Sequence, residues 1–332
     1  MKNKNIFITG GGGYVGSALV PSLLKKNFKV IVYDKFYYGN FLEYHKNLKV
    51  IKGDIRDTKK LEKNIKNCDY FIHLACISND ASFVLDEKKS KEINFDCFES
   101  IVKSAKKKGV KRFIYASTSS VYGVSKQRNV KENHKFKPLT LYNKLKGDCE
   151  PILNKYNDKT FTTVTIRPAT VCGFAPRLRL DVSVNILTFQ AYFNKEITIF
   201  GGKQLRPNVY IKDMIRAYHR LISVKKSKIQ GESFNCGFEN LSIEKIAYKV
   251  KKIVELETNQ VVKIKRIKSN DIRSYHVNSD KIKTRLGFKS KYKIEDGVKS
   301  LIAHFKNNIV YYKKNKNKTF FYNVKHLKKV GF

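Results

Sequence analysis

A glycine cluster near the start of the chain constrains the fold more than any other feature. The segment Thr9-Gly-Gly-Gly-Gly-Tyr-Val-Gly16 directly follows an apolar strand pattern and opens a helical pattern. In such a position Gly10 permits a tight turn, Gly13 lets an anionic ligand approach the backbone, and Gly16 lets the helix pack closely on the strand. Because the N-terminus of a helix attracts anions, the cluster predicts a site for a pyrophosphate.

The first half of the chain alternates short apolar runs with amphipathic patterns. Several runs are continuously apolar, as expected for strands that are buried on both faces of a sheet. The strand–helix–strand repetition predicts an α/β fold, a Rossmann-type doubly wound parallel sheet with helices on both sides. The expected strands are Ile6–Thr9, Lys29–Asp34, Val50–Gly53, Asp69–Leu74, Arg112–Ser117, Phe161–Arg167 and Ile197–Phe200, and the expected helices are Val15–Lys26, Glu87–Lys107, Asp213–Ile222, Ser242–Glu255 and Ile294–Lys306.

A carboxylate at the end of the second expected strand bears on the identity of the ligand. Asp34 can accept hydrogen bonds from a ribose diol and would repel a 2′-phosphate, which favours NAD over NADP. The alternative is an ordinary solvent-facing residue at a strand end. Since Asp34 follows the glycine cluster by one helix and one strand, the sequence predicts an NAD site.

The chain has 332 residues, which is enough for two domains. We expect an NAD-binding domain over residues 1–172, with a returning segment near residues 207–224. A smaller C-terminal domain over residues 173–310 would then bind the substrate. Residues 311–332 are rich in Lys and Asn and contain no acidic residue, so we expect a basic tail.

The charge of the chain is strongly unbalanced. Lys and Arg number 68 and Asp and Glu 28, which gives a formal net charge of +40. Such a field attracts polyanions, so nucleic acid is the first partner to consider. Most of the basic residues are Lys, however, and they are spread over every segment. This pattern favours a solvated basic surface over a dedicated nucleic-acid partner, because Arg is the side chain that suits phosphates and base edges.

The cysteines and the apolar runs bear on the compartment. The six cysteines show no paired spacing, so they indicate neither a disulfide framework nor a zinc site, and no metal is expected. We therefore expect a reducing, cytoplasmic location. No apolar run approaches the ~18 residues of a membrane span, so no membrane partner is expected either.

Four further motifs follow the glycine cluster along the chain. They are Gly53-Asp54-Ile55-Arg56-Asp57, His73-Leu74-Ala75-Cys76, Tyr115-Ala-Ser-Thr-Ser-Ser-Val-Tyr-Gly123 and Tyr142-Asn-Lys-Leu-Lys146. Together the five motifs resemble the extended short-chain dehydrogenase/reductase family, in particular the NAD-dependent epimerases and dehydratases that act on nucleotide sugars. The resemblance covers roughly the first 175 residues, in the order of the family.

This resemblance implies an enzyme, and it assigns cofactor contacts. The residues implied to contact NAD are Gly10, Gly13, Tyr14, Val15, Gly16, Asp34, Asp54, Ile55, Leu74, Ala75, Tyr142 and Lys146. It also implies a homodimer formed through two helices near Glu87–Lys107 and Leu141–Tyr156. Their apolar residues could form a stripe for a four-helix bundle, or they could pack inward on the sheet. These residues are Ile93, Phe95, Phe98, Ile101, Leu145, Ile152 and Leu153.

The chemistry of the last motif makes sense on its own. Tyr142 and Lys146 share one face of a helix, because they are four residues apart. A free tyrosine has a pKa of about 10, and a nearby ammonium lowers it towards a useful base. Tyr142 would take the proton of a sugar hydroxyl while hydride leaves the same carbon for the nicotinamide. By resemblance, Thr118 would hydrogen-bond that hydroxyl and Lys146 would also hold the nicotinamide ribose.

The second half of the chain carries weaker matches, which imply contacts to a nucleotide-diphosphate sugar. Thr170 and Asn185 stand at sugar- and diphosphate-contacting positions, and Thr170 replaces an Asn that family members often carry. Arg206 and Arg273 match arginines that bind the nucleotide. Two arginines that converge on a diphosphate fit bidentate anion recognition.

Two serines narrow the expected reaction. Sugar-nucleotide 4,6-dehydratases and decarboxylases of the family carry an acidic residue just after the Ser/Thr, and the 3,5-epimerases carry a Cys. Here those positions are Ser119 and Ser120. We therefore expect redox chemistry at one carbon, with a C4 epimerase first and a 4-dehydrogenase or reductase second. A non-enzymatic NAD-binding regulator would have no need of Thr118, Tyr142 and Lys146. His73 is expected to pack at a strand end rather than to catalyse.

Overall fold

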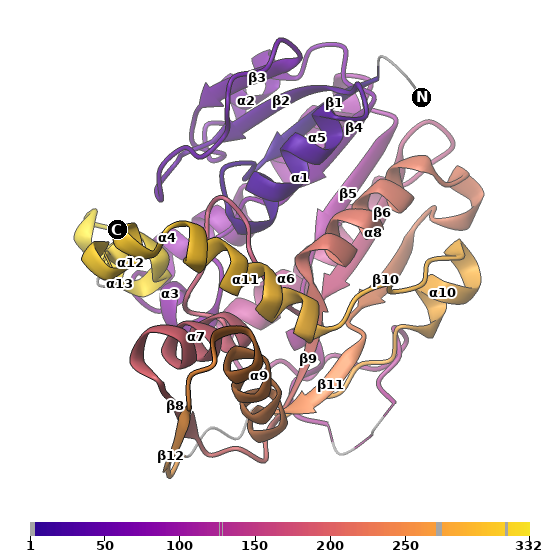
Figure 1. Ribbon diagram of the computed structural model, residues 1–332. Helices are drawn as coiled ribbons and strands as arrows, with labels where there is room; N and C mark the ends of the chain where they lie inside the picture. Colours follow the sequence, from indigo (N-terminus) through magenta and orange to yellow (C-terminus); the bar gives the residue numbers. More distant parts are fainter. Residues whose placement is uncertain (1–3, 126, 128, 270–273, 316–317) are drawn as a thin grey trace.

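The computed structural model describes residues 4–125, 127, 129–269, 274–315 and 318–332. Its centre is a seven-stranded parallel sheet in the order β10-β6-β5-β4-β1-β2-β3, which confirms the predicted Rossmann-type fold (Figure 1). The strands are β1 (Asn5–Thr9), β2 (Lys29–Asp34), β3 (Leu48–Lys52), β4 (Tyr70–His73), β5 (Arg112–Ala116), β6 (Thr162–Pro168) and β10 (Glu232–Cys236).

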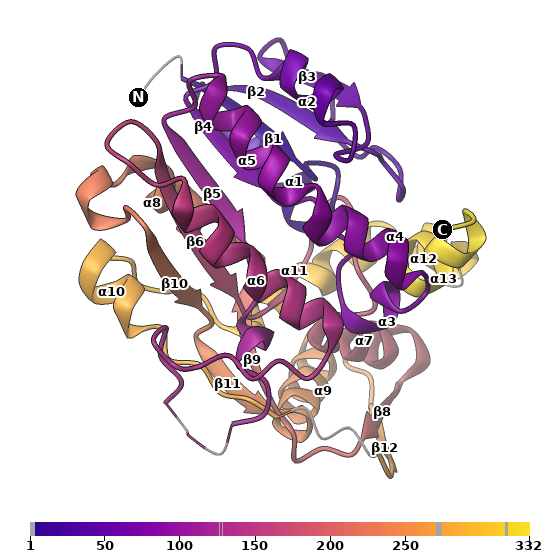
Figure 2. The ribbon, with the colours of Figure 1, turned by 180° about the vertical axis from the view of Figure 1, so that it is seen from behind.

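Helices cover both faces of this sheet, as Figures 1 and 2 show from opposite sides. Successive strand residues point to opposite faces. Thus Ile6 and Ile8 pack into one core and Phe7 into the other, which explains the continuously apolar strands. One face is covered by α1 (Tyr14–Leu24), α8 (Ile211–Ser223) and α10 (Asp280–Leu286), and the other by α2 (Thr58–Asn64), α5 (Phe98–Lys107) and α6 (Leu141–Lys155).

The helix that we expected over Glu87–Lys107 is divided. Helix α4 (Glu87–Lys91) is followed by a π-helical turn, η1 (Glu92–Asp96), before α5 begins. Five of the seven apolar residues proposed for a dimer stripe are buried in the chain itself, and only Phe95 and Ile152 are half-buried. The alternative of inward packing therefore holds for most of the stripe.

The returning segment is longer than expected. It continues beyond residue 224 to β10, which pairs with β6 at the edge of the central sheet. Between these returns a second lobe forms around its own apolar core. It comprises α7 (Ser183–Phe189), η3 (Gln190–Asn194), α9 (Ile243–Thr258), α11 (Ile294–Asn307), a sheet of β7 (Thr170–Cys172), β9 (Leu205–Tyr210) and β11 (Glu239–Ser242), and a pair of β8 (Glu196–Phe200) with β12 (Lys263–Ile267). The strands β9 to β12 and the helix α7 were not predicted.

The expected basic tail is folded. It forms α12 (Ile309–Asn315), η5 (Thr319–Phe321) and α13 (Asn323–Lys329), and it lies beside α4 and the short α3 (Asp80–Phe83) in both views (Figures 1 and 2). Leu327 is fully buried in the same core as Phe7. Although the segment is rich in lysine, it thus has an apolar face that packs against the core of the central sheet. Within the described residues, no helix is long and apolar enough to cross a bilayer.

Candidate active site

A cavity of about 770 Å³ lies along the carboxyl ends of the central strands. Such a place is where open α/β sheets bind ligands, and its size is that of a ligand pocket. Of the residues that we expected to bind cofactor or substrate, all that the structure describes line it except Asn185. The lining residues from that set are Gly10, Gly13, Tyr14, Val15, Gly16, Asp34, Asp54, Ile55, Leu74, Ala75, Thr118, Tyr142, Lys146, Thr170 and Arg206.

The glycine loop leaves no room for side chains. Gly10 has a φ of +76°, and a Cβ there would lie 2.4 Å from the backbone nitrogen of Ala75. A Cβ on Gly16 would lie 2.6 Å from the carbonyl oxygen of Gly10. Gly13 precedes α1 and provides no side-chain cap, so the helix begins at the cavity with its first amides uncapped by a side chain. The loop thus fits the diphosphate of a dinucleotide.

Asp34 closes the ribose end of this loop. Its carboxylate accepts hydrogen bonds from the backbone amides of Gly12, at 2.9 Å, and Phe36, at 2.6 Å. Burial raises the pKa of Asp34, and the two amides and the charge of Arg177 oppose that rise. The carboxylate therefore both organises the loop and faces the cavity, where a ribose diol would donate to it.

A second carboxylate, Asp54, follows the end of β3 and, unlike Asp34, is paired with basic side chains. Asp54 forms ion pairs with Arg56, at 2.9 Å, and Lys35, at 3.4 Å. Hydrogen bonds from Arg56 outweigh partial burial and lower the pKa of Asp54 to about 2. The neighbouring Ile55 is buried and offers an apolar surface to the cavity. The negative charge of Asp54 is thus balanced by Arg56 and Lys35, whereas Asp34 has no such ion pair among the described residues.

Helix α6 brings the proposed catalytic residues together. Thr118 caps the short 3₁₀ helix η2 (Ser119–Tyr122), and its hydroxyl accepts from the amide of Ser120 at 3.1 Å. Lys146 is buried, and its ammonium donates to the carbonyl of Ala116 and lies 4.5 Å from the ring centre of Tyr115. Tyr142 stands one turn earlier on α6 and is half-buried at the cavity wall.

The electrostatics of Tyr142 differ from the expectation. Burial raises the pKa of its phenol, and the nearby Arg179 and a hydrogen bond from the Asn79 backbone only partly oppose that rise. The pKa of Tyr142 thus lies above its ordinary value in this structure, because the effect of burial is the larger one. In the ligand-free protein Tyr142 is therefore a protonated phenol at neutral pH.

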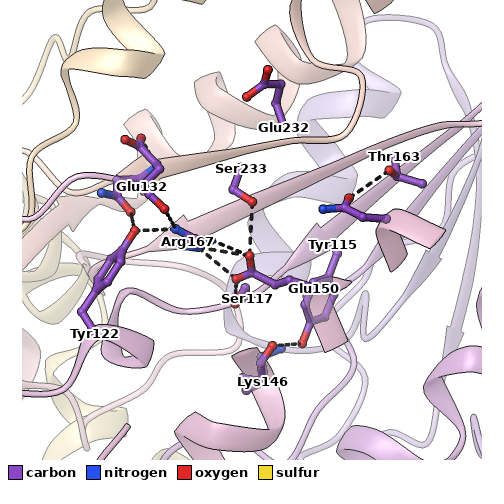
Figure 3. A network of polar contacts seen from close by, with 12 residues as sticks. Tyr115, Ser117, Tyr122, Glu132, Lys146, Glu150, Thr163, Arg167, Glu232 and Ser233 are labelled. Carbon is purple, nitrogen blue, oxygen red and sulfur yellow. Dashed lines mark hydrogen bonds and ion pairs between the residues drawn. The ribbon is translucent and has the colours of Figure 1, made fainter. Parts of the chain in front are cut away.

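A buried ion pair between Glu150 and Arg167 contacts the segment that carries Thr118 (Figure 3). The carboxylate of Glu150 accepts from Arg167 Nε at 2.9 Å and Nη2 at 2.7 Å, and both side chains are at most 6% exposed. Glu150 also accepts from Ser117 Oγ at 2.7 Å, and Ser117 directly precedes Thr118. Because Glu150 lies one turn after Lys146 on α6, this network fixes the helix against the end of β5.

His73 does not belong to the site. It is buried between its sheet neighbours, and its Nδ1 lies 2.7 Å from the hydroxyl of Thr9. Burial and the charge of Lys146 lower its pKa to about 3, so the imidazole is neutral. The structure confirms that His73 packs at a strand end.

One expected substrate residue, Asn185, does not line the cavity. Asn185 is fully buried, and its amide accepts from the Gly173 backbone at 2.8 Å and donates to Tyr14 at 3.0 Å and to the Arg179 carbonyl at 2.8 Å. We correct its role from a direct diphosphate contact to a support for the loop that follows Gly173. Arg273 lies outside the described residues.

The sequence interpretation missed a charged cluster at the cavity wall. Arg177, Arg179 and Asp181 all line the cavity, together with Asn323 from the C-terminal helix. Arg179 and Asp181 form an ion pair at 2.8 Å. The alternation Arg-Leu-Arg-Leu-Asp after the glycine turn was a signal for three of them, because buried-strand patterns do not place charges at every second position without partners. No local signal marked Asn323.

Comparison with known proteins agrees with this geometry. Residues 6–237 match the NAD dependent epimerase/dehydratase family. The chain is 28% identical over 327 residues to the dTDP-D-glucose 4,6-dehydratase of Mus musculus. The aligned region covers 92% of this chain and 89% of that relative.

Two solved structures show the same fold over almost their whole length. One is the UDP-glucuronic acid 4-epimerase from Bacillus cereus in complex with UDP-glucuronic acid and NAD, with a TM-score of 0.79, 28% identity and coverage of 91% of this chain and 99% of that one. The other is the UDP-glucose 4-epimerase from Thermotoga maritima with UDP-glucose, with a TM-score of 0.82, 25% identity and coverage of 92% and 99%. This chain belongs to the NAD-dependent epimerase/dehydratase family of extended short-chain dehydrogenases/reductases.

Proposed function

We propose that the protein is an NAD-dependent epimerase that inverts carbon 4 of a nucleotide-diphosphate sugar through a transient keto sugar. The observation that carries this proposal is the state of the cavity carboxylates. Asp34, Asp54, Asp80 and Asp181 line the described part of the cavity, and each accepts a hydrogen bond from the protein. None is positioned beside Thr118 as a spare acid, where Ser119 and Ser120 stand.

This absence of a spare acid favours one reaction class over the others. Dehydration and C5 epimerisation both require a base for a proton next to the keto group, in addition to the base for the hydroxyl. Oxidation and reduction at one carbon need only the latter. Among the described residues, Tyr142 is the cavity group suited to that single proton transfer.

Hydride transfer, proton transfer and substrate binding would each depend on different groups. NAD, when bound, accepts the hydride of the sugar carbon and returns it. The hydroxyl of Thr118 would hydrogen-bond the sugar hydroxyl, and the phenol oxygen of Tyr142 would take and return its proton. Lys146, held by the carbonyl of Ala116, would orient the nicotinamide ribose and favour the phenolate. Arg206 and Thr170 face the cavity from the second lobe and would bind the sugar nucleotide.

The proposal is tested by incubating the NAD-loaded protein with a panel of UDP- and dTDP-hexoses in D₂O and following the sugars by NMR. We expect interconversion of the C4 epimers, with no net NADH and no solvent deuterium in the product. Stoichiometric NADH would instead identify a 4-dehydrogenase. A 4-keto-6-deoxy product carrying deuterium would identify a dehydratase, and either result would overturn the epimerase proposal.

Two expectations about the assembly belong to the same proposal. We propose a homodimer through the segment Glu87–Lys107, which comprises α4, η1 and α5, and through α6. In these elements Phe95 and Ile152 leave part of their apolar surface exposed. Light scattering at micromolar concentration tests it, and a monomer would exclude it. We also propose a cytoplasmic location, which the six free cysteines support.

A further inference from the structure

Arg177 is the largest fully buried side chain of the described residues, and it is charged. Its side chain lies at the wall of the cofactor cavity and is 2% exposed. No carboxylate of the described residues lies within ion-pair distance of it, and its Nε has no hydrogen-bond partner there. A buried cation without a close counter-ion is costly, so its retention requires an explanation.

The adjacent Arg179 shows what a compensated arginine looks like in the same segment. Its guanidinium holds both oxygens of Asp181, at 2.8 and 3.2 Å. Asp181 also accepts from the backbone amide of Asn323 at 3.0 Å. The carboxylate of Asp181 is therefore already paired with Arg179. It does not serve as a close counter-ion for Arg177, whose positive charge stays uncompensated.

Arg177 is held in place by neutral groups. One Nη2 bond, of 2.5 Å, goes to the side-chain oxygen of Asn323, while the guanidinium lies 4.0 Å from the ring centre of Tyr38. The amide nitrogen of Asn323 donates to Ser78 at 3.0 Å, which fixes the orientation of its oxygen. Asn323 therefore accepts a hydrogen bond from the guanidinium of Arg177 without neutralising its charge, so that the charge can attract an anion in the cavity.

The position of Arg177 identifies the anion that it would meet. Its backbone amide donates to Ser17 in the first turns of α1, at 3.1 Å. Tyr38 follows β2 and Asp34, and Arg177 is close enough for its charge to act on Asp34. These groups belong to the glycine loop and the ribose end of the cavity, whereas Arg206 lies on β9 in the second lobe. The dinucleotide cofactor, rather than the sugar nucleotide, places its diphosphate near this loop.

We propose that Arg177 binds the diphosphate of the NAD cofactor, and that the C-terminal helix α13 keeps it charged and oriented through the neutral acceptor Asn323. The C-terminal segment is then part of the cofactor site. His326 anchors it further, through a contact of 2.7 Å from its Nε2 to the carbonyl of Tyr37. This inference concerns cofactor binding and does not depend on the proposed C4 chemistry.

The test measures binding to the cofactor-free full chain by calorimetry. The variants are Arg177→Met, which removes the charge and keeps much of the stem, and Asn323→Asp, which puts a carboxylate beside the guanidinium. The control is Asn307→Asp, which makes the same change of charge at an exposed position of α11. The probes are NAD, adenosine, which has no diphosphate, and UDP-glucose.

We expect both variants to raise the Kd for NAD about ten- to a hundredfold, as for a lost hydrogen bond to a charged group. The Kd for adenosine and for UDP-glucose should change less than threefold, and the control should bind all three probes as the unmodified protein does. If Arg177→Met does not fold, Asn323→Asp decides alone, because its new ion pair preserves the packing.

Three outcomes would overturn the proposal. Unchanged NAD binding in both variants would remove Arg177 from the cofactor site. A loss confined to UDP-glucose would assign the guanidinium to the sugar nucleotide. Normal NAD binding by Asn323→Asp, with a loss in Arg177→Met, would show that the neutrality of Asn323 has no role.

Discussion

The two ends of the cavity are built in different ways. At the catalytic end, Thr118 comes from the turn after β5, and Tyr142 and Lys146 come from α6, so that each belongs to a compact motif. At the diphosphate end, the glycine loop meets Arg177 from the second lobe and Asn323 from the C-terminal helix. The first end is assembled by local chain geometry, and the second by contacts between segments up to 289 residues apart.

This difference shows where each end is vulnerable. The catalytic residues are fixed by one helix and one buried ion pair, so changes there should affect chemistry or the stability of the domain. The diphosphate end depends on a terminal segment whose removal leaves the motifs intact. Changes there should affect cofactor affinity without altering the order of the motif residues.

The largest effect is expected from Tyr142→Phe, which removes only the phenol oxygen. If the catalytic end acts through proton transfer by Tyr142, kcat should fall by about 10² to 10⁴. The Kd for NAD should change little, because the glycine loop, Asp34 and Arg177 remain. Steady-state kinetics and calorimetry check the two parts. A variant that keeps most of its turnover would refute Tyr142 as the proton-transfer residue.

Breaking the buried ion pair should cost stability rather than affinity. Glu150→Gln leaves the charge of Arg167 buried without its counter-ion, so we expect the free energy of unfolding to fall by about 3–5 kcal/mol. The matched control on the same helix is Asp148→Asn, which breaks the exposed pair with Lys144 and should cost at most ~1 kcal/mol. Urea unfolding measures both. Similar losses for the two variants would show that the network in Figure 3 is not special.

Cofactor choice should depend on one of the two strand-end carboxylates. Asp34→Asn removes the charge that repels a 2′-phosphate and keeps one oxygen for the glycine loop. We expect the preference for NAD over NADP to narrow by roughly tenfold, about the free energy of one charged hydrogen bond. Asp54→Asn should leave the ratio unchanged, since Arg56 and Lys35 already neutralise Asp54. Equal effects of the two variants on the NAD to NADP ratio would contradict this assignment.

The same contrast explains what could be predicted from the sequence. The central sheet and the placement of Thr118, Tyr142 and Lys146 at one cavity were predicted because each depends on residues close together in the chain, such as Tyr142 and Lys146 on one helix turn. Asn185 was misassigned because its type fits a ligand contact, while its burial behind Tyr14 is a tertiary property.

The C-terminal segment was misjudged for a related reason. Its composition is basic and polar, so it resembles a solvated tail. The buried apolar residues that dock it are Tyr312, Phe321 and Leu327, and their spacing matches neither a helical nor a strand period. The role of Asn323 depends on a partner 146 residues away, so no local pattern could reveal it.

The smallest effect is a shift of a pH profile, and it tests how Tyr142 becomes a base. Burial raises the pKa of its phenol in the ligand-free protein, so Tyr142 needs a positive charge nearby to ionise. A protonated phenol cannot accept the proton of the sugar, so kcat/KM should fall as the pH drops through the pKa that Tyr142 has in the NAD-loaded enzyme. Lys146→Met removes one positive charge and raises that pKa, so the acid limb should move to higher pH by about one unit.

The position of this limb, not the height of the profile, is the informative quantity, because Lys146 also orients the ribose and its loss lowers the rate at every pH. A base beyond the electrostatic reach of Lys146 would leave the limb in place. His73 is not that base, because its ring is buried against Thr9 and does not line the cavity. An acid limb that Lys146→Met does not move, in an enzyme that Tyr142→Phe has inactivated, would mean that Tyr142 positions the sugar while another group takes its proton.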